Sequence, residues 1–567
     1  MRWVGLILCA ILGLVMLICG LLVPAHLRAV DVGVIESAGR KSRTLVEEGI
    51  ALLNQQEIGA AEMVCQAARM STVRGHEKLA LGIRNFAGAR PSVAFWGVAN
   101  SSLENLFGSS QTSSTTNSPA IASFVIQEEN REKILGMLAS SQALAVRELM
   151  KCRTLTNTVL FPPSSSASGQ AMDTAIAIGG LLLLEERLTP TLRGTVVSLS
   201  TAANKGGDSQ QLEQVLLDLL SLGQRFNWGQ LAVFIGQIED TETLRFLANQ
   251  AREADELLPV LFSAIRLSGK PAVVAKYLTA FGKAGLDDMV ACMRYGAGGL
   301  NELLARNRRL CQPGWRQFVV GYDPFGSFYY FAVKYCLRMP FLALMIKWFF
   351  YLAGGFLFAL AIHFGRFVPV LERPLQVRGF HLARESLFAL GFLLVVLLLS
   401  EPFLAQESQK AEFPFRLRLP LLGNVAPAGT TANRSPLMNQ LSLLTLLFFF
   451  VLQALIYTAC LVRLAEIRRL NLAPRIKLKL LENEDHLFDA GLYLGFVGTI
   501  ISLILVSLGV IKPSLMAAYS STSFGIIFVS IFKIFHLRPL RRKLLLQAEG
   551  MPEYSDNKVS TNVARPS

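Results

Sequence analysis

Six stretches of about twenty apolar residues divide the chain, and each is long enough to cross a lipid bilayer as a helix. They lie near residues 4–23, 340–363, 387–404, 440–462, 491–511 and 515–536. Residues 31–335, between the first two stretches, have ordinary polarity and are long enough to bury a core. The sequence therefore predicts an all-α, polytopic membrane protein of about six spans with one large soluble insert.

The basic residues indicate how the chain is oriented. The formal net charge is +14, and much of it gathers in three flanks of the apolar stretches: Arg366, Arg373, Arg378 and Arg384; Arg463, Arg468, Arg469, Arg475, Lys477 and Lys479; Lys533, Arg538, Arg541, Arg542 and Lys543. Such flanks are retained in the cytoplasm. Counting spans back from them places the N-terminus inside and residues 25–338 outside. The charge follows membrane topology, so we expect no nucleic-acid partner.

These patterns predict six segments along the chain. Residues 1–30 form either an uncleaved anchor, which the length of the apolar run favours, or a signal peptide, because Val23-Pro24-Ala25 fits a cleavage rule. The other segments are an extracytoplasmic helical domain (31–335), two spans around a basic cytoplasmic loop (336–405), an extracytoplasmic proline-rich loop (406–437), a three-span domain (438–545) and a disordered cytoplasmic tail (546–567).

The insert has the apolar periodicity of helices. Leu45, Ile50, Leu52 and Leu53 share one helix, Gly59 ends it, and Ala60, Met63, Val64 and Ala67 begin another. The pair is loosely similar to a tetratricopeptide unit. Further helical stretches lie near 129–150, 170–187, 209–224 and 228–308, whereas 108–119 and 162–169 read as flexible loops. The repeats are too degenerate to separate a solenoid-like domain from an irregular helical one.

Nothing in the insert indicates catalysis. Its two histidines, His26 and His76, have no nucleophile motif beside them, and the Gly296–Gly299 cluster is interpreted as a turn. The sequence contains no Cys-x-x-Cys pair or Cys/His cluster, so we expect no metal, no cofactor and no enzyme activity. Disulfides among Cys65, Cys152, Cys292 and Cys311 are permitted outside the cytoplasm but not required. The insert reads as a module that binds a protein partner.

Three ionisable residues lie in or near the apolar stretches: Lys347, Glu401 and Lys533. Charges inside lipid mark ion paths when they are central. These three lie toward the ends of their stretches, where long side chains reach the interface. We therefore interpret them as interfacial anchors.

Small and polar residues form stripes on the last two apolar stretches. Gly495, Gly498 or Thr499, and Ser502 recur at helical spacing on the first, and Ser514, Ala518, Ser521 or Thr522, and Gly525 do so on the second. Such stripes serve close helix packing, because small residues let backbones approach and hydroxyls bond across. They also serve as the polar lining of a pore. Periodicity alone favours packing.

The residues within these stripes resemble a known family. "LGFVGT" (494–499), a short link and "AAYSSTSFG" (517–525) are similar to the paired pore-helix signatures of the MotA/TolQ/ExbB proton-channel family. The matching residues are Leu494, Gly495, Gly498, Thr499, Thr522 and Gly525. The resemblance covers about residues 440–545. ExbB- and TolQ-like members carry a glutamate five residues before the threonine, where this chain has Ala517. MotA-like members leave the carboxylate to a partner's helix.

The resemblance implies a channel-forming subunit in the bacterial inner membrane, driven by the proton-motive force. It implies a homo-oligomer around the span of an ExbD/TolR/MotB-like partner. The pore-lining candidates are Thr499, Thr522, Ser502 and Ser521, and the helix-packing candidates are Gly495, Gly498 and Gly525. The alternative is a membrane-anchored scaffold whose exported domain binds proteins and whose spans only pack in the bilayer.

Overall fold

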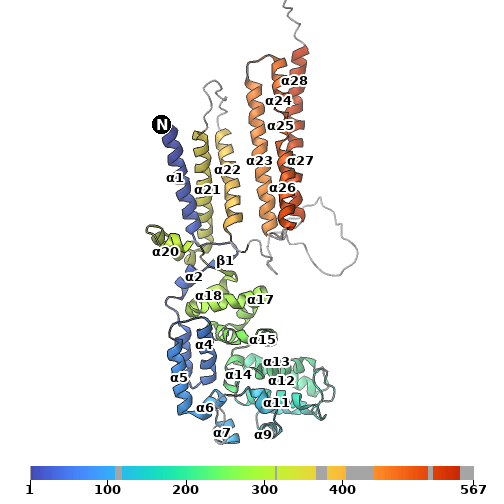
Figure 1. The fold of residues 1–567 in the computed structure, drawn as a ribbon. Coiled ribbons are helices and arrows are strands. Elements are labelled where there is room, and N and C mark those ends of the chain that lie inside the picture. The colour runs from blue at the N-terminus through green and yellow to red at the C-terminus, as the bar shows by residue number, and fades with distance from the viewer. Residues whose placement is uncertain are drawn as a thin grey trace, which may run out of the picture. The chain divides into compact units, whose positions relative to one another are not determined.

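The computed structural model describes residues 2–108, 118–312, 314, 316–365, 380–401, 403, 440–507 and 515–549. Over these residues the chain is mostly helical, as the sequence predicts (Figure 1). It divides into two compact units. One joins Met1–Val23 to Phe341–Glu407 and Ala411–Ser567, and the other spans Pro24–Pro340. The predicted proline-rich loop and most of the loop 108–119 and of the tail lie outside the described residues.

The unit Pro24–Pro340 is built almost entirely of short helices. They are α2 (Val32–Gly39), α3 (Leu45–Asn54), α4 (Ile58–Met70), α5 (His76–Ala89), α6 (Pro91–Trp96), α7 (Ser101–Phe107), α8 (Ile121–Val125), α9 (Glu128–Ala139), α10 (Leu144–Lys151), α11 (Gln170–Leu184), α12 (Pro190–Asn204), α13 (Gln210–Gly223), α14 (Trp228–Ile235), α15 (Thr241–Glu253), α16 (Leu258–Ser268), α17 (Pro271–Met293), α18 (Gly296–Arg306), α19 (Arg316–Val320) and α20 (Phe325–Arg338). Two 3₁₀ turns, Cys152–Thr154 and Asp255–Leu257, join them. The strands β1 (Ala29–Asp31) and β2 (Arg309–Cys311) complete the unit.

Local sequence signals explain where several of these helices begin. Thr44 and Glu47 form a reciprocal capping box at the start of α3, and Asn227 and Gln230 form another at α14. Helix α11 is apolar all round, and Met172–Leu183 are buried. It therefore belongs to the core of this unit.

The predicted helix pair around Gly59 exists, but its break lies elsewhere. α3 ends at Asn54 and Gln56 adopts a left-handed conformation (φ 62°), so the turn comes before Gly59. Gly59 lies inside α4, where a Cβ would approach the Asn227 side chain to 2.7 Å. The glycine permits close packing and does not end a helix, so that interpretation was wrong.

Other differences from the expected helices are local. The stretch 129–150 forms two helices, α9 and α10, and α12 was not predicted. The Gly296–Gly299 cluster begins helix α18 and is not a turn. A Cβ at Gly299 would lie 3.0 Å from the Ile35 side chain, so the glycine allows α18 to approach α2. Cys65, Cys152 and Cys292 are free thiols.

The two ends of this unit are fastened to each other. β1 pairs in parallel with β2, in the register Ala29–Arg309, Val30–Leu310 and Asp31–Cys311. The Tyr329 hydroxyl donates to the Asp31 carboxylate at 2.7 Å, and the Cys336 thiol contacts the Pro24 carbonyl oxygen at 3.6 Å. The chain therefore enters and leaves this unit at one place.

The other unit contains the apolar helices. They are α1 (Arg2–Leu22), α21 (Pro340–Gly365), α22 (Phe380–Ser400), α23 (Gln440–Arg469), α26 (Ala490–Ser507) and α27 (Leu515–Phe532), with the polar α24 (Pro474–Asn483), α25 (Asp485–Phe488) and α28 (Arg538–Glu549). A π-helical turn at Lys533–Leu537 joins α27 to α28. Over the described residues, four helical segments are long and apolar enough to cross a membrane. They are Trp3–Leu22 in α1, Pro340–Ile362 in α21, Leu446–Arg469 in α23, and Tyr519–Glu549, which runs through α27, the π-helical turn and α28. The other two predicted spans form shorter apolar helices, Glu385–Ser400 and Ala490–Ile500.

Glycines mark where α1 contacts α21. A Cβ at Gly13 would lie 3.3 Å from the Gly354 carbonyl oxygen, and one at Gly20 would lie 2.6 Å from the Tyr351 ring. Toward the C-terminus of this unit, α23, α24, α25, α27 and α28 bury a small apolar cluster that includes Leu464, Leu481, Phe488 and Phe532. Both arrangements use small or apolar residues where helices meet.

Candidate functional site

Most of the predicted site residues converge between α26 and α27, which pack against each other and against α23 (Figure 1). Gly491, Gly495 and Thr499 are buried on α26 at every fourth position and so share one face. We call this region the polar seam; its residues are Gln453, Gly491, Gly495, Gly498, Thr499, Ser521, Thr522 and Gly525. The seam brings hydroxyl groups, an amide side chain and the backbone carbonyls of glycines together between apolar helices.

The hydroxyls of Thr499 and Thr522 meet across the seam, with 2.5 Å between their Oγ1 atoms. Each also reaches the Gly495 carbonyl oxygen, at 3.1 Å from Thr499 and 3.2 Å from Thr522. A hydroxyl donates one proton and accepts two, so one threonine can donate to the carbonyl and the other to its partner. The two hydroxyls thus form a short chain of exchangeable protons between α26 and α27.

Three glycines bring these helices close enough for that contact. A Cβ at Gly495 would lie 2.8 Å from the Ser521 carbonyl oxygen, and one at Gly525 would lie 2.8 Å from the Gly491 carbonyl oxygen. A Cβ at Gly498 would collide with the Ser521 hydroxyl. The groups met at Gly495 and Gly525 are backbone, which cannot turn aside. All three glycines therefore lie at helix crossings within a single chain.

Gln453 of α23 belongs to the seam, although sequence reasoning missed it. Its side chain is 1% exposed and donates through Nε2 to the Gly491 carbonyl oxygen at 2.9 Å. Its Oε1 atom has no hydrogen-bond partner among the described residues. The available signal was a lone glutamine in the apolar run "FFFVLQALIY". A buried amide in such a run needs a polar partner, and here it links α23 to α26.

Two pore-lining candidates remain, Ser521 and Ser502, and the structure describes the side chain of Ser521 only. Ser521 is 1% exposed, and its hydroxyl has no hydrogen-bond partner among the described atoms. Ser502 lies in α26, but its side chain is outside the described residues. The seam thus contains Thr499, Thr522 and Ser521 with Gly495, Gly498 and Gly525.

A second polar feature of the apolar helices is an ion pair. The Lys347 ammonium on α21 lies 2.7 Å from the Glu401 carboxylate, which follows α22, and both side chains are fully buried. The Lys347 ammonium also lies 5.9 Å from the centre of the Tyr351 ring. The interpretation of Lys347 and Glu401 as interfacial anchors was wrong, because each is enclosed with the other. Their separation of 54 positions hid the pairing from sequence periodicity.

Charged side chains also meet where α26 begins and α27 ends. Lys533 lies 2.7 Å from the Asp489 carboxylate, which precedes α26. Lys533 begins the π-helical turn, and within that turn the His536 Nε2 atom lies 3.0 Å from the Tyr457 hydroxyl of α23. These contacts fix the basic end of α27 to the neighbouring helices.

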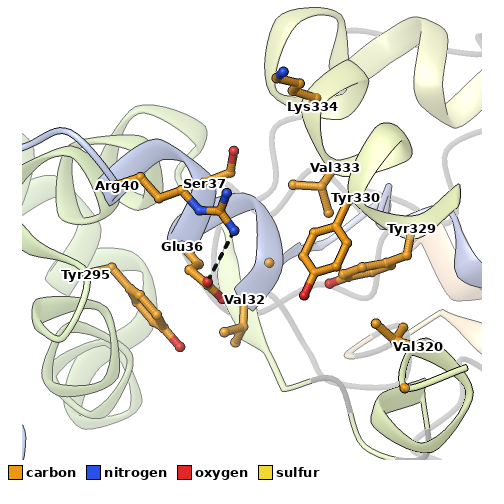
Figure 2. Close-up of a pocket in the computed structure, with 12 residues that line it drawn as sticks. Val32, Glu36, Ser37, Arg40, Tyr295, Val320, Tyr329, Tyr330, Val333 and Lys334 are labelled. Atoms are coloured by element: carbon orange, nitrogen blue, oxygen red, sulfur yellow. Dashed lines mark ion pairs between the residues drawn. The ribbon is translucent and has the colours of Figure 1, made fainter. Parts of the chain in front are cut away.

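The unit Pro24–Pro340 contains a cavity of about 500 Å³ between α2, α19 and α20. Tyr295, Tyr329 and Tyr330 line it, and an Arg40–Glu36 ion pair of 3.7 Å lies at its edge (Figure 2). Behind Tyr329, burial acts to raise the pKa of Asp31, but hydrogen bonds from His26, Tyr329 and the Gly33 amide hold that pKa below its usual range. These groups fasten α2 and α20 and offer no nucleophile–base pair.

Over the residues that the structure describes, no group of three or more His, Cys, Asp or Glu side chains is arranged to hold a metal ion. Compared with known proteins, the chain matches no family model, no curated protein and no solved structure.

Proposed function

We propose that this chain is the channel-forming subunit of a proton-motive-force-coupled complex of the bacterial inner membrane, similar to the MotA/TolQ/ExbB proteins. The observation that carries the proposal is the Thr499–Thr522 hydroxyl pair at 2.5 Å. Two valines would have nearly the same shape there, whereas two hydroxyls can bond water or a protonated group. α27 has Ala517 where ExbB- and TolQ-like proteins carry a glutamate, so the single span of a partner would supply the carboxylate.

The outer faces of α26 and α27 support an oligomer. Phe496, Val497, Ile526 and Ile527 are exposed, at 60%, 46%, 50% and 50%. Such faces require lipid or neighbouring copies to cover them. In a ring of copies, part of this surface would be covered by the next subunit and the rest by lipid.

The remaining features of the proposal concern topology. We propose six spans, an N-terminus and a C-terminus inside, and an extracytoplasmic, solenoid-like domain between the first two spans. The basic residues at the end of α23 and in α28 support the cytoplasmic assignment of these segments. The apolar helix α11 is buried in the unit Pro24–Pro340, which supports counting it as part of that domain and not as a span. Reporter fusions after Asn117 test it. Cytoplasmic activity of that fusion would overturn the orientation.

A second function is a membrane-anchored scaffold that conducts no ions. It is favoured by the intrachain partners of the seam: Gln453 bonds the Gly491 carbonyl, and the threonines bond the Gly495 carbonyl. Polar side chains of this kind also stabilise helix packing without any transport. Both functions give the exported domain a protein partner.

Reconstitution separates the two functions. The full chain would be expressed with and without a single-span partner that carries an aspartate early in its span, and purified into vesicles. The channel function predicts an oligomer of defined mass by native mass spectrometry and proton flux that requires the partner. An assembled complex without flux in either preparation would support the scaffold instead.

A further inference from the structure

Exposed aromatic side chains concentrate in one short segment of the unit Pro24–Pro340. Among the described residues of this unit, every exposed aromatic side chain lies between 318 and 331: Phe318, Tyr322, Tyr330 and Phe331. The other aromatic residues described there, such as Trp228 and Phe262, are buried or partly buried. Large apolar side chains gathered at one surface mark an interaction site.

Helix α20 presents this surface on a defined face. Its inner face, with Tyr329, Ala332 and Cys336, is buried in the unit. Tyr330, Lys334 and Arg338 follow one another at every fourth position, so they share a second face of the helix, and all three are exposed. Tyr330 and Lys334 also lie at the cavity beside α2, where they are exposed (Figure 2). The exposed face therefore combines aromatic rings with two cations.

Only Met339 separates α20 from a helix that is long and apolar enough to cross a membrane. α20 ends at Arg338, and α21 begins at Pro340 as one of the four helices long and apolar enough to cross a membrane. Aromatic rings are enriched at the level of lipid headgroups, and basic side chains there contact anionic phosphates. We infer that the exposed face of α20, with Phe318 and Tyr322, binds the surface of the bilayer, and that Lys334 and Arg338 contact anionic lipid headgroups. This requires only that α21 is in the membrane, so its failure would leave the channel proposal standing.

Photocrosslinking in the full chain tests the contact. A benzophenone amino acid would replace Phe331 in one variant and Leu144 in another, because both side chains are 69% exposed and only the first lies on this surface. The protein would be reconstituted into phosphatidylcholine vesicles that contain one third phosphatidylglycerol and then irradiated. Mass spectrometry should find lipid adducts at position 331 at least about tenfold above those at position 144. Equal adducts at both positions would overturn the inference, as would crosslinks from 331 to protein alone.

The two cations give a separate readout. In the Phe331 probe variant, Lys334→Gln with Arg338→Gln should lower the ratio of phosphatidylglycerol to phosphatidylcholine adducts, by roughly fivefold for each charge removed. Lys151→Gln, an exposed lysine on α10, serves as the charge control and should leave the ratio unchanged. An unchanged ratio in the double variant would show that the face does not recognise anionic headgroups.

Discussion

The Lys347 ammonium lies 2.7 Å from the Glu401 carboxylate, and neither side chain is exposed. Removing one member of a buried pair leaves the other charge without compensation, at a cost of about 3–5 kcal/mol. We therefore expect Lys347→Met to lower the free energy of unfolding strongly. The double variant Lys347→Met/Glu401→Gln should be less destabilised than that single variant, because no lone charge remains.

Chemical unfolding in detergent micelles measures these differences. Lys533→Met is the matched control, because the Lys533–Asp489 pair is partly exposed, at 36% and 25%. Its loss should cost at most about 1 kcal/mol. A Lys347→Met protein as stable as the wild type would contradict the buried pair.

The unit Pro24–Pro340 should be stable on its own only when both of its ends are present. A fragment of residues 24–340 should fold alone, with a helical circular dichroism spectrum and a cooperative thermal transition. A fragment of residues 35–330 should melt at a lower temperature, because it loses β1 and the Asp31–Tyr329 hydrogen bond. Equal melting temperatures would mean that the joined ends contribute nothing to stability.

Glu62, a buried carboxyl group, should make the stability of the protein depend on pH. Burial raises the pKa of this carboxyl from 4.5 to about 7 in the folded protein. Between these values the folded state binds more protons than the unfolded state, so stability should fall as the pH rises from 4.5 to 7. Glu62→Gln should reduce this slope, whereas the exposed Glu132→Gln should not. The unfolding midpoint of the full chain, followed from pH 4.5 to 7.5, reports the effect, and an unchanged slope in Glu62→Gln would rule it out.

Gly495, at a close helix crossing, can be compared with Gly391, which has more space around its Cα atom. Gly495→Ala places a Cβ against the Ser521 carbonyl and should destabilise the protein by about 1–3 kcal/mol. Gly391→Ala on α22 meets nothing closer than the Val451 side chain at 3.8 Å and should be tolerated. Because the crossing at Gly495 lies within one chain, the defect should appear in the unfolding of the monomer. Equal stability of the two variants would contradict the close approach.

The sequence predicted the helices better than the contacts between them. Apolar spacing located α3, α4, α11 and α13, because burial on one or all faces leaves a local pattern. It failed where the partner is distant in sequence. Gly59 looked like a helix breaker, but it is needed where α4 meets the Asn227 side chain.

The candidate site shows the same division. The small-residue stripes of α26 and α27 were visible because each repeats within one helix. The contribution of Gln453 was not, because the Gly491 carbonyl that it bonds is 38 residues away. The periodicity of the stripes also could not reveal that Thr499 and Thr522 face each other within one chain.

The measurement closest to the central claim is proton flux through vesicles that contain the assembled complex and its single-span partner. Thr499→Val and Thr522→Val keep the side-chain shape and remove the hydroxyls, so each variant should assemble normally, by native mass, and conduct at least about tenfold more slowly. Thr458→Val is the control, since that hydroxyl bonds carbonyls of its own helix α23. Wild-type flux in both threonine variants of the seam would contradict the channel function and leave the seam as helix packing.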